Sequence, residues 1–516
     1  MADASAGIKP RIFGSASFLT RDERLVDNVN SRLRGGVGLD NALVGPSGPL
    51  SPSFLYGVAR DTLESSDSGF IYEEWVKKYG VAFEVPAALG RKTIMLFDPK
   101  ALQHYYMRET WTYISLPTRR TFLQRTVNVV QIFIAPGFLH RMIFRPGNQY
   151  SGPSARIIIV PNTRFQSAIR KLTPIYYDCA YKAKAGWESI IDASNGDSAI
   201  IEVQNWMNHI TLDTIGLAGF SLDFGPLDGK TTSVATVLDT MGSSPSRSAL
   251  NAGFFVLSQE IQQEFSKISK ELLDKRRKEK EAGIVDGKAE KSVIGLLLKA
   301  EEADSDLHMS HEEVVAQVNK CVGLKLGTTL NCSLQMKVLL LAGYETTSTV
   351  LSWVLLELAK NPAIQTKLRE ELLAFSLEPT YDQLTNNLPY LDAVVHETLR
   401  LDSPITEFIR IATEDDVITL SEPVRTRSGE LVNSISIAKG TRIGISVTCM
   451  NRSTAIWGQD AKEFRPERWL EKDGLPKKAQ EIQGHRHLLT FSEGPRACLG
   501  KGFALAELKV SFIVTD

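Results

Sequence analysis

A ten-residue segment near the C-terminus, FSEGPRACLG, holds the residues whose types and spacing point most directly to chemistry. Phe491, Gly494, Arg496, Cys498 and Gly500 follow the spacing F-x-x-G-x-R-x-C-x-G, which chance would produce on the order of once in ten thousand such sequences. A cysteine thiolate can be the proximal ligand of haem iron, where its electron density favours cleavage of the O–O bond. The motif therefore predicts that Cys498 is the axial ligand of a haem iron.

The other four residues of the motif have types that suit a haem pocket. Gly494 and Gly500 would let the backbone approach the macrocycle, because a Cβ at either position would collide with it. Arg496 supplies a fixed positive charge for a haem propionate, and Phe491 would keep water away from the ligand. Backbone N–H groups around the sulfur would stabilise the thiolate. The alternative is a glycine-rich loop around a buried thiol.

Further motifs precede this segment in the chain. HETLRL contains Glu397 and Arg400, spaced as E-x-x-R, and FRPERW contains Arg468. Together with the C-terminal motif, they make the chain resemble the cytochrome P450 family, in particular its fungal members of the microsomal class. The resemblance implies that Glu397, Arg400 and Arg468 form a buried ion-pair cluster that fixes the scaffold of the haem loop. It also implies that Arg410 points at a haem propionate.

The remaining motif, LLAGYETTSTVLSW, resembles the long distal helix of the same family. Ala342 and Gly343 would leave room for oxygen and substrate, because their side chains are small. Glu345 and Thr346 would be the catalytic residues, an acid–alcohol pair that orders water and relays protons, a task that needs groups within hydrogen-bond reach. Taken alone, the segment is equally typical of an amphipathic core helix whose threonines bond back to backbone carbonyls.

The resemblance implies a haem-thiolate monooxygenase with haem b as its cofactor. The implied reaction converts R–H, O2, two electrons and two protons into R–OH and water. Its substrate would be an apolar small molecule, and its electrons would come from NADPH through a separate NADPH-cytochrome reductase. Two alternatives remain: a haem-binding but catalytically incompetent product of an imperfect gene model, and a haem-thiolate isomerase or dehydratase. Glu345 and Thr346 favour the monooxygenase over the isomerase.

Composition and charge exclude several other classes of protein. The 516 residues include 59 Lys and Arg against 60 Asp and Glu, a formal charge of −1, which provides no basic excess for binding nucleic acid. With 43% hydrophobic and 23% charged residues, the chain is typical of a globular protein. Five cysteines in a chain of this length are too few for a disulfide scaffold, and without a CxxC pair among them a zinc site is not expected. Those outside the haem motif are expected to be small buried hydrophobes: Cys179, Cys321, Cys332 and Cys449.

The pattern along the chain predicts a mainly α protein with a small β-rich subdomain, in agreement with the cytochrome P450 fold. Residues 83–97 are typical of a β-hairpin, and Asp98 and Pro99 of a helix start with a capping residue. The apolar periodicity is mostly helical from about 166 to 400 and changes to short strands over 404–450.

Residues 1–50 are expected to form a poorly ordered lead-in, and 51–516 the P450 domain. Two segments of this domain depart from the family pattern. Segment 127–165 lacks the spaced residues that contact haem propionates in relatives. Segment 318–335 is interpreted as translated intron sequence, since its Gly and Thr residues suit a helix poorly. The domain is expected to be C-terminally truncated at Asp516, before the family's last helix and β-hairpin are complete.

The sequence contains no window that approaches the 18 or more consecutive apolar residues of a membrane-spanning helix. Charged residues throughout the first fifty positions argue against a signal peptide or anchor there. The family resemblance nevertheless implies the surface of the endoplasmic reticulum membrane as the location, with peripheral association.

Overall fold

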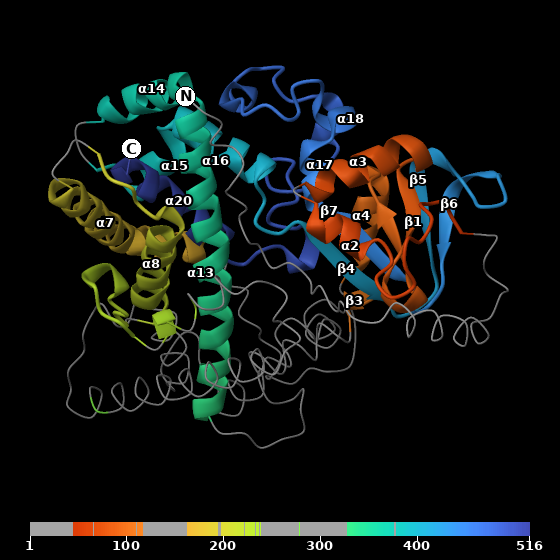
Figure 1. Ribbon diagram of the computed structural model, residues 1–516, viewed down its shortest axis with the longest axis horizontal. Helices are drawn as coiled ribbons and strands as arrows, with labels where there is room; N and C mark the ends of the chain where they lie inside the picture. Colours follow the sequence, from red (N-terminus) through yellow and green to blue (C-terminus); the bar gives the residue numbers. More distant parts are fainter. Residues whose placement is uncertain are drawn as a thin grey trace.

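The chain folds into two regions in the computed structural model, which describes residues 45–116, 162–238, 278 and 328–515, apart from 66, 110, 195–197, 221, 233, 237, 376 and 377. Figure 1 shows a β-rich region on the right and a helical region on the left, with the long helix α13 between them. The predicted fold class, mainly α with a small β-rich subdomain, is confirmed.

The described strands of the β-rich region form two sheets. Five strands lie in the order β1-β2-β7-β4-β3, and β5 pairs with β6. Neighbours are antiparallel except for β2 and β7. The hairpin expected over 83–97 is confirmed as β1 and β2, and its turn places Leu89 and Gly90 at positive φ values of 61° and 68°. The bounds are Ala82–Pro86 (β1), Lys92–Leu96 (β2), Tyr113–Ser115 (β3), Glu407–Ala412 (β4), Asp416–Arg425 (β5), Leu431–Ile437 (β6) and Arg442–Ser446 (β7).

Helix α4 (Pro99–Arg108) connects this hairpin to β3 and begins as the sequence predicts. The side chain of Asp98 accepts a hydrogen bond from Ala101 N at 2.9 Å, and Pro99 occupies the first turn. Asp98 is fully buried and also accepts from Ser421 N of β5 at 2.8 Å, so the cap ties α4 to the second sheet. The other helices beside the sheets are α2 (Ala59–Glu64), α3 (Ser68–Tyr79), α17 (Val447–Arg452) and α18 (Thr454–Trp457).

The helical region confirms the mostly helical pattern expected between 166 and 400 for the described part of that stretch. Two of its helices begin with a proline, a residue that fits the first turn because its missing N–H has no partner there in any case. The helices are α7 (Asn162–Ala193), α8 (Val203–Ile215), α13 (Thr328–Lys360), α14 (Pro362–Leu373), α15 (Tyr381–Asn386), α16 (Pro389–Leu401) and α20 (Lys501–Thr515); the short α19 (Lys477–Gln480) precedes α20.

Helix α13 contains a run of Thr and Ser residues that are poor helix formers. Their hydroxyls bond back to carbonyls of the preceding turn: Thr346 Oγ1 donates to Ala342 O at 2.6 Å, and Thr349 Oγ1 donates to Glu345 O at 2.7 Å. The expectation that segment 318–335 would disfavour a helix is wrong for residues 328–335. Their backbone is helical, because extending an existing helix by one residue costs little.

A hydrophobic core runs through both regions and contains residues of the sheet, α4, α7, α13, α16 and α20. A second cluster lies between α8 and α13. Cys179 and Cys449 are buried in the first core, as expected. Cys321 and the side chain of Cys332 lie outside the described residues.

Part of the expected lead-in belongs to the folded structure. Ser47 N donates to Arg425 O at 3.0 Å, and Ser47 O accepts from Glu84 N at 3.2 Å. Gly48 packs so closely that a Cβ there would overlap the Glu84 carbonyl oxygen. Residues 45–48 are therefore held by backbone hydrogen bonds and close packing, and the fold begins before residue 51. Residues 1–44, and 117–161 with most of segment 127–165, lie outside the described part.

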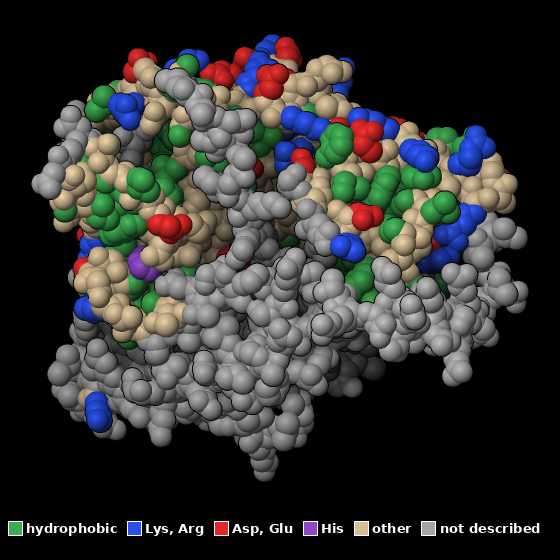
Figure 2. Space-filling model, viewed as in Figure 1, with side chains coloured by type: hydrophobic (Ala, Val, Ile, Leu, Met, Phe, Trp, Pro, Cys, Tyr) green, Lys and Arg blue, Asp and Glu red, His purple; other side chains and the backbone are tan. Residues whose placement is uncertain are grey.

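Charges of both signs are mixed on the described surface. Figure 2 shows acidic and basic side chains next to one another along the upper edge, as the balanced composition predicts. By length and apolar composition, one described segment, Leu339–Lys360, could cross a membrane. This segment is part of α13, which packs against α8, α16 and α20, so it also has the character of a core helix.

Candidate functional site

The loop that contains Cys498 runs from Phe491 to the start of α20 and includes a short 3-10 helix, η8 (Gly494–Arg496). Cys498 N donates to Phe491 O at 2.8 Å, and the Phe491 ring is half-buried against the main core. Although Cys498 is an exposed residue, partial burial of its thiol raises the pKa, whereas backbone N–H groups of Gly500 and Lys501 act to lower it. The loop therefore already directs N–H donors at the sulfur, where they would stabilise a thiolate.

The two glycines of this loop differ in what they permit. Gly494 has a φ of 71°, and a Cβ there would lie 2.9 Å from Tyr106 O. A side chain there is thus excluded by the backbone conformation and by α4, and the contact of Gly494 with a macrocycle stays a prediction. At Gly500 a Cβ would meet nothing closer than Cys498 Sγ, at 3.9 Å. The space around Gly500 is therefore open beside the thiol, and the approach of its backbone to a macrocycle stays a prediction.

Arg410 and Arg496 converge on a carboxylate that the sequence analysis did not single out, Glu109. Arg410 lies on β4, and its Nη2 donates to Glu109 Oε1 at 3.3 Å. Burial raises the pKa of Glu109, while the positive charges of Arg410 and Arg496 oppose that rise. Nothing in the sequence around Glu109 indicates that it lies beside these arginines, so its position is known only from the fold.

Within the pair of Arg410 and Glu109, Arg410 Nε and Glu109 Oε2 are buried and have no hydrogen-bond partner in the described structure. Tyr105 and Tyr106 of α4 are buried beside them, and burial raises the pKa of both phenols. Buried polar groups are normally satisfied by a partner. Unsatisfied atoms beside two arginines therefore indicate a place where a polar or charged ligand group binds.

Glu397, Arg400 and Arg468 are brought together in a fully buried cluster. The Glu397 carboxylate accepts from Arg400 Nη2 at 2.8 Å and Nε at 2.9 Å, and from Arg468 Nε at 3.4 Å. It also accepts from Arg465 N and Trp469 Nε1, both at 3.0 Å. The remaining N–H groups of Arg400 donate to the carbonyl oxygens of Asn451, Ala461 and Glu463.

Two further members of this cluster, Trp469 and Asp460, were not predicted from the sequence. Arg468 donates to Asp460 Oδ1 at 3.1 Å and to Asp460 O at 2.9 Å. Although burial opposes the change, hydrogen bonds from Arg465 and Arg468 lower the pKa of Asp460. Trp469 follows Arg468 directly in FRPERW, so the sequence indicates that it lies near the cluster. Asp460 lies outside the motifs, and nothing in the sequence indicates its part in the cluster.

Glu345 and Thr346 lie side by side on α13, both half-buried. Burial raises the pKa of the Glu345 carboxyl to about 7. The Thr346 hydroxyl donates to Ala342 O, which leaves its oxygen lone pairs as acceptors. The hydrogen bond predicted for an ordinary core helix is thus present together with a carboxyl that can hold a proton near neutral pH.

The small residues before this pair have different surroundings. Ala342 is exposed on α13, consistent with the space that the sequence analysis expected there. A Cβ at Gly343, however, would lie 3.2 Å from Ile215 Cγ1 of α8. Gly343 therefore serves the close packing of α13 on α8, which corrects the expectation that it leaves room for substrate.

Helix α20, which follows the Cys498 loop directly, packs against both α7 and α13. Phe503 on α20 contacts the cluster that contains Leu340 and Tyr344 of α13. It also packs edge-on against Tyr176 of α7, with ring centroids 5.2 Å apart. The loop with the thiol and the helix with the acid–alcohol pair are thus fixed relative to one another through α20.

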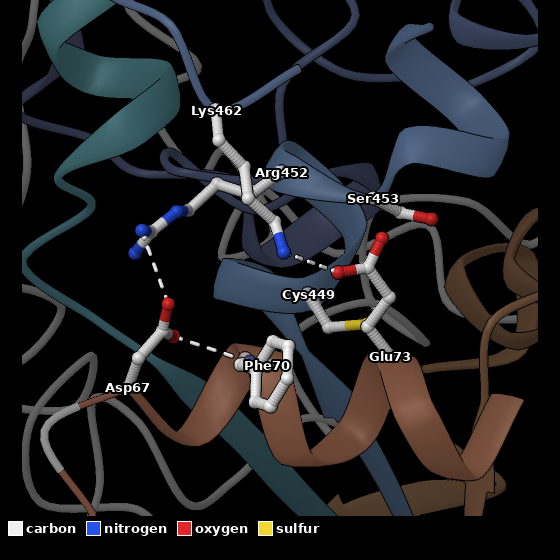
Figure 3. Close-up of a pocket in the computed structure, with 8 residues that line it drawn as sticks. Asp67, Phe70, Glu73, Cys449, Arg452, Ser453 and Lys462 are labelled. Atoms are coloured by element: carbon white, nitrogen blue, oxygen red, sulfur yellow. Dashed lines mark hydrogen bonds and ion pairs between the residues drawn. The ribbon is translucent and has the colours of Figure 1, made fainter. Parts of the chain in front are cut away.

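A pocket between α3 and α17 lies apart from these residues (Figure 3). Two ion pairs cross it: Asp67 with Arg452 at 3.1 Å, and Glu73 with Lys462 at 2.7 Å. Glu73 also accepts from Thr454 N at 2.9 Å. The charged residues of this pocket are paired with one another, and the pairs hold α3 against the segment after β7. The pocket contains none of the predicted site residues.

Comparison with known proteins agrees with the motifs. The family model described as Cytochrome P450 matches residues 153–515. The chain is 46% identical over 502 residues to Cytochrome P450 monooxygenase claQ of Ampulloclitocybe clavipes, covering 94% of this chain and 87% of that protein. The chain belongs to the cytochrome P450 family. It is also 46% identical over 504 residues to Cytochrome P450 monooxygenase claO of the same fungus (93% and 86% covered), and 33% identical over 493 residues to Cytochrome P450 monooxygenase 205 of Postia placenta (90% and 83% covered).

This P450 is accordingly an oxidoreductase of the monooxygenase type, and its family implies a haem cofactor. The residues present fit that group. The thiol of Cys498 is exposed and has open space at Gly500. Arg410 has a buried Nε with no partner in the described structure, and Arg496 lies near the same carboxylate. A thiolate ligand and guanidinium groups for two propionates are the donor set that haem requires.

Proposed function

We propose that this P450 inserts one oxygen atom of O2 into an apolar small molecule, with haem b bound through Cys498 and with electrons from NADPH supplied by a separate reductase. The observation that carries the proposal is the half-buried Glu345 beside Thr346, on the helix that packs against α20, which follows the Cys498 loop directly. An isomerase or dehydratase would need no such proton-holding pair. The reaction R–H + O2 + 2 e− + 2 H+ → R–OH + H2O consumes two protons, and Glu345 can pass them on one after the other, because its carboxyl can hold and release a proton near neutral pH.

The cofactor would be held by residues of three elements. Cys498 would ligate the iron as a thiolate, stabilised by the N–H groups of Gly500 and Lys501. Arg410 of β4 and Arg496 of η8 would bind the propionates. When bound, haem supplies the iron chemistry that activates oxygen. The protein's own part is to hold the group, to exclude water and to deliver protons.

Proton delivery would fall to Glu345 and Thr346. With a pKa of about 7, the Glu345 carboxyl can both release and take up a proton near neutral pH, which suits repeated proton donation and recovery. The Thr346 hydroxyl gives its hydrogen to Ala342 O, so its oxygen can accept a hydrogen bond from water. An apolar substrate is consistent with Leu339 and Ala342, which accompany the pair along α13.

The first test is a reduced, carbon-monoxide-bound difference spectrum of the full chain supplied with haem, with Cys498→Ser as the control. A Soret band in the thiolate position for the wild type only is expected. Substrate turnover with NADPH and a reductase is then measured. Product that forms without NADPH would favour the isomerase or dehydratase. Haem binding without any turnover across a panel of apolar substrates would favour the incompetent product.

We propose in addition that the chain associates with the surface of the endoplasmic reticulum membrane. Support comes from large apolar side chains exposed at the β1–β2 turn and in the segment that packs against it, Leu89 and Leu50, which are 57% and 92% exposed. Co-sedimentation with neutral phospholipid vesicles would test this. Retention of binding in a Leu50→Ser, Leu89→Ser double variant would count against this surface.

A further inference from the structure

Glu109 lies in the candidate site, but neither the proposed haem binding nor the proposed proton delivery gives this residue a role. It follows α4 directly, and its side chain is 1% exposed. Oε1 accepts from Arg410 Nη2 at 3.3 Å, and Oε2 is buried without a partner in the described structure. Arg496 of η8 acts on the same carboxylate through its charge. A buried acid thus stands at the two guanidinium groups that would receive the haem propionates.

The groups that face Glu109 come from three elements. Arg410 lies on β4, Arg496 on η8, and Tyr105 and Tyr106 on α4. The two phenols are buried and their pKa values are raised, so they remain neutral over the ordinary pH range. The charges that matter are therefore two positive guanidinium groups and one carboxylate.

Haem would change this local charge balance. Without it, two guanidinium groups and one carboxylate sum to +1. Two propionates bring −2, which would leave an uncompensated negative charge in a buried place if Glu109 stayed ionised. Like charges at close range in a poorly solvated site strongly disfavour ionisation, and one carboxylate then takes a proton. Burial has already raised the pKa of Glu109, so it is the group most ready to do so.

We propose that Glu109 is a haem-linked proton site: it neutralises one positive charge of the arginine pair in the haem-free chain and takes up one proton from solvent when haem binds. The inference rests on the proposed haem site. Glu109 is a positioning residue, because it would act on the cofactor through Arg410. In the haem-free chain its carboxylate holds the Arg410 guanidinium, and once protonated it releases that guanidinium to the propionate.

The proton balance predicts a specific pH dependence. Between the pKa of Glu109 without haem and its higher pKa with haem, binding takes up one proton, so affinity falls as pH rises. A single linked proton gives a slope of about tenfold in affinity per pH unit. Ionisation of the Cys498 thiol on binding acts in the opposite direction. It is common to all variants, so the difference between variants isolates Glu109.

The experiment titrates the haem-free full chain with ferric haem between pH 6 and 9, following the Soret band. The chains compared are wild type, Glu109→Gln, Glu109→Asp and Glu414→Gln. Glu414 is the matched control, because it contacts Arg108 and Thr112 near the same helix end. Relative to Glu109→Gln, the wild type should lose affinity with rising pH by up to about tenfold per unit. Glu109→Asp and Glu414→Gln should retain the wild-type profile.

Direct proton counting gives a second readout that needs no activity. In weakly buffered solution, the wild type should take up about one more proton per haem than Glu109→Gln. Should Glu109→Gln fail to fold, an infrared difference spectrum of isotopically labelled wild type should show a protonated glutamate carboxyl appear when haem binds. Equal pH profiles, or no such carboxyl, would overturn the inference alone. A wild type that binds no haem would overturn the proposed function as well.

Discussion

Two buried charge clusters in this P450 contain arginines and a glutamate, yet they differ in whether their hydrogen bonds are complete. In the cluster of Glu397, Arg400 and Arg468, every guanidinium N–H of Arg400 has an acceptor, and Glu397 accepts on both oxygens. In the cluster of Glu109 and Arg410, one nitrogen and one oxygen are buried without a partner in the described structure.

The difference separates a scaffold from a binding site. A closed cluster has no capacity left for a ligand, and removal of any member leaves a buried charge uncompensated. An open cluster contains buried donors without partners, which lowers the stability of the ligand-free chain. Such donors are expected where a bound ligand supplies the missing acceptors. Residue types alone do not distinguish the two clusters, since both contain arginines and a glutamate. The distinction between scaffold and binding site rests on whether the buried polar atoms have hydrogen-bond partners.

The largest effect is expected from breaking the closed cluster. Glu397→Ala leaves Arg400 and Arg468 buried without their shared carboxylate and should lower the free energy of unfolding by about 3–5 kcal/mol. Urea unfolding of the haem-free chain measures it. Glu422→Ala is the control, because Glu422 pairs with Lys478 at the surface, where such pairs contribute about 0–1 kcal/mol. Equal losses in the two variants would mean that the closed cluster is not a scaffold.

Glu345 on α13 is a further carboxyl whose pKa burial raises, and the effect of its removal on proton delivery can be measured. Glu345→Gln removes a carboxyl that burial holds near pKa 7 and should slow product formation by about 10²–10⁴-fold. Because the protonated form is the donor, wild-type turnover should fall as pH rises through about 7, and this decline should vanish in the variant. Steady-state product formation with a reductase measures both. Glu357→Gln on the same helix, where Glu357 pairs with Lys360, should behave as wild type.

Arg410 tests the open cluster directly. Arg410→Met should weaken haem affinity by about 10–100-fold, the value of a hydrogen-bonded charge contact, while the haem-free chain loses little stability because Glu109 can protonate. Arg468→Met should show the opposite pattern, with strongly reduced stability. Haem titration and urea unfolding of both variants provide the comparison. A stability loss for Arg410→Met as large as that for Arg468→Met would remove the distinction between the clusters.

The smallest effect concerns the two glycines of the Cys498 loop. Gly494→Ala forces an alanine into a φ of 71° and against Tyr106 O, and should cost about 1–2 kcal/mol of stability even without haem. Gly500→Ala meets no protein atom closer than 3.9 Å, so it should leave the haem-free stability unchanged and impair only haem loading. Thermal unfolding with and without haem separates them. A destabilised haem-free Gly500→Ala chain would contradict this assignment.

Short-range patterns made much of this protein predictable. The β1–β2 hairpin, the Asp98 cap and the helical stretches depend on turn residues, capping side chains and apolar periodicity, all of which act within a few residues. The family followed from motifs in a fixed order, which the family model and the fungal relatives confirm. The spacing E-x-x-R likewise placed Glu397 and Arg400 on one helix, where they form an ion pair.

The sequence by itself determined the family, the thiol and the site residues that lie in motifs, whereas the tertiary structure added Glu109 and decided what several of the motif residues are for. Gly343 packs against Ile215, and Gly494 is required by its φ and by Tyr106, neither of which a local motif can show. The bond between Glu109 and Arg410 joins residues 301 positions apart. Such partners meet only once α4 and β4 have packed together. A hydrogen bond depends on the distance between two atoms in the folded chain, and the spacing of residues along the sequence does not give that distance.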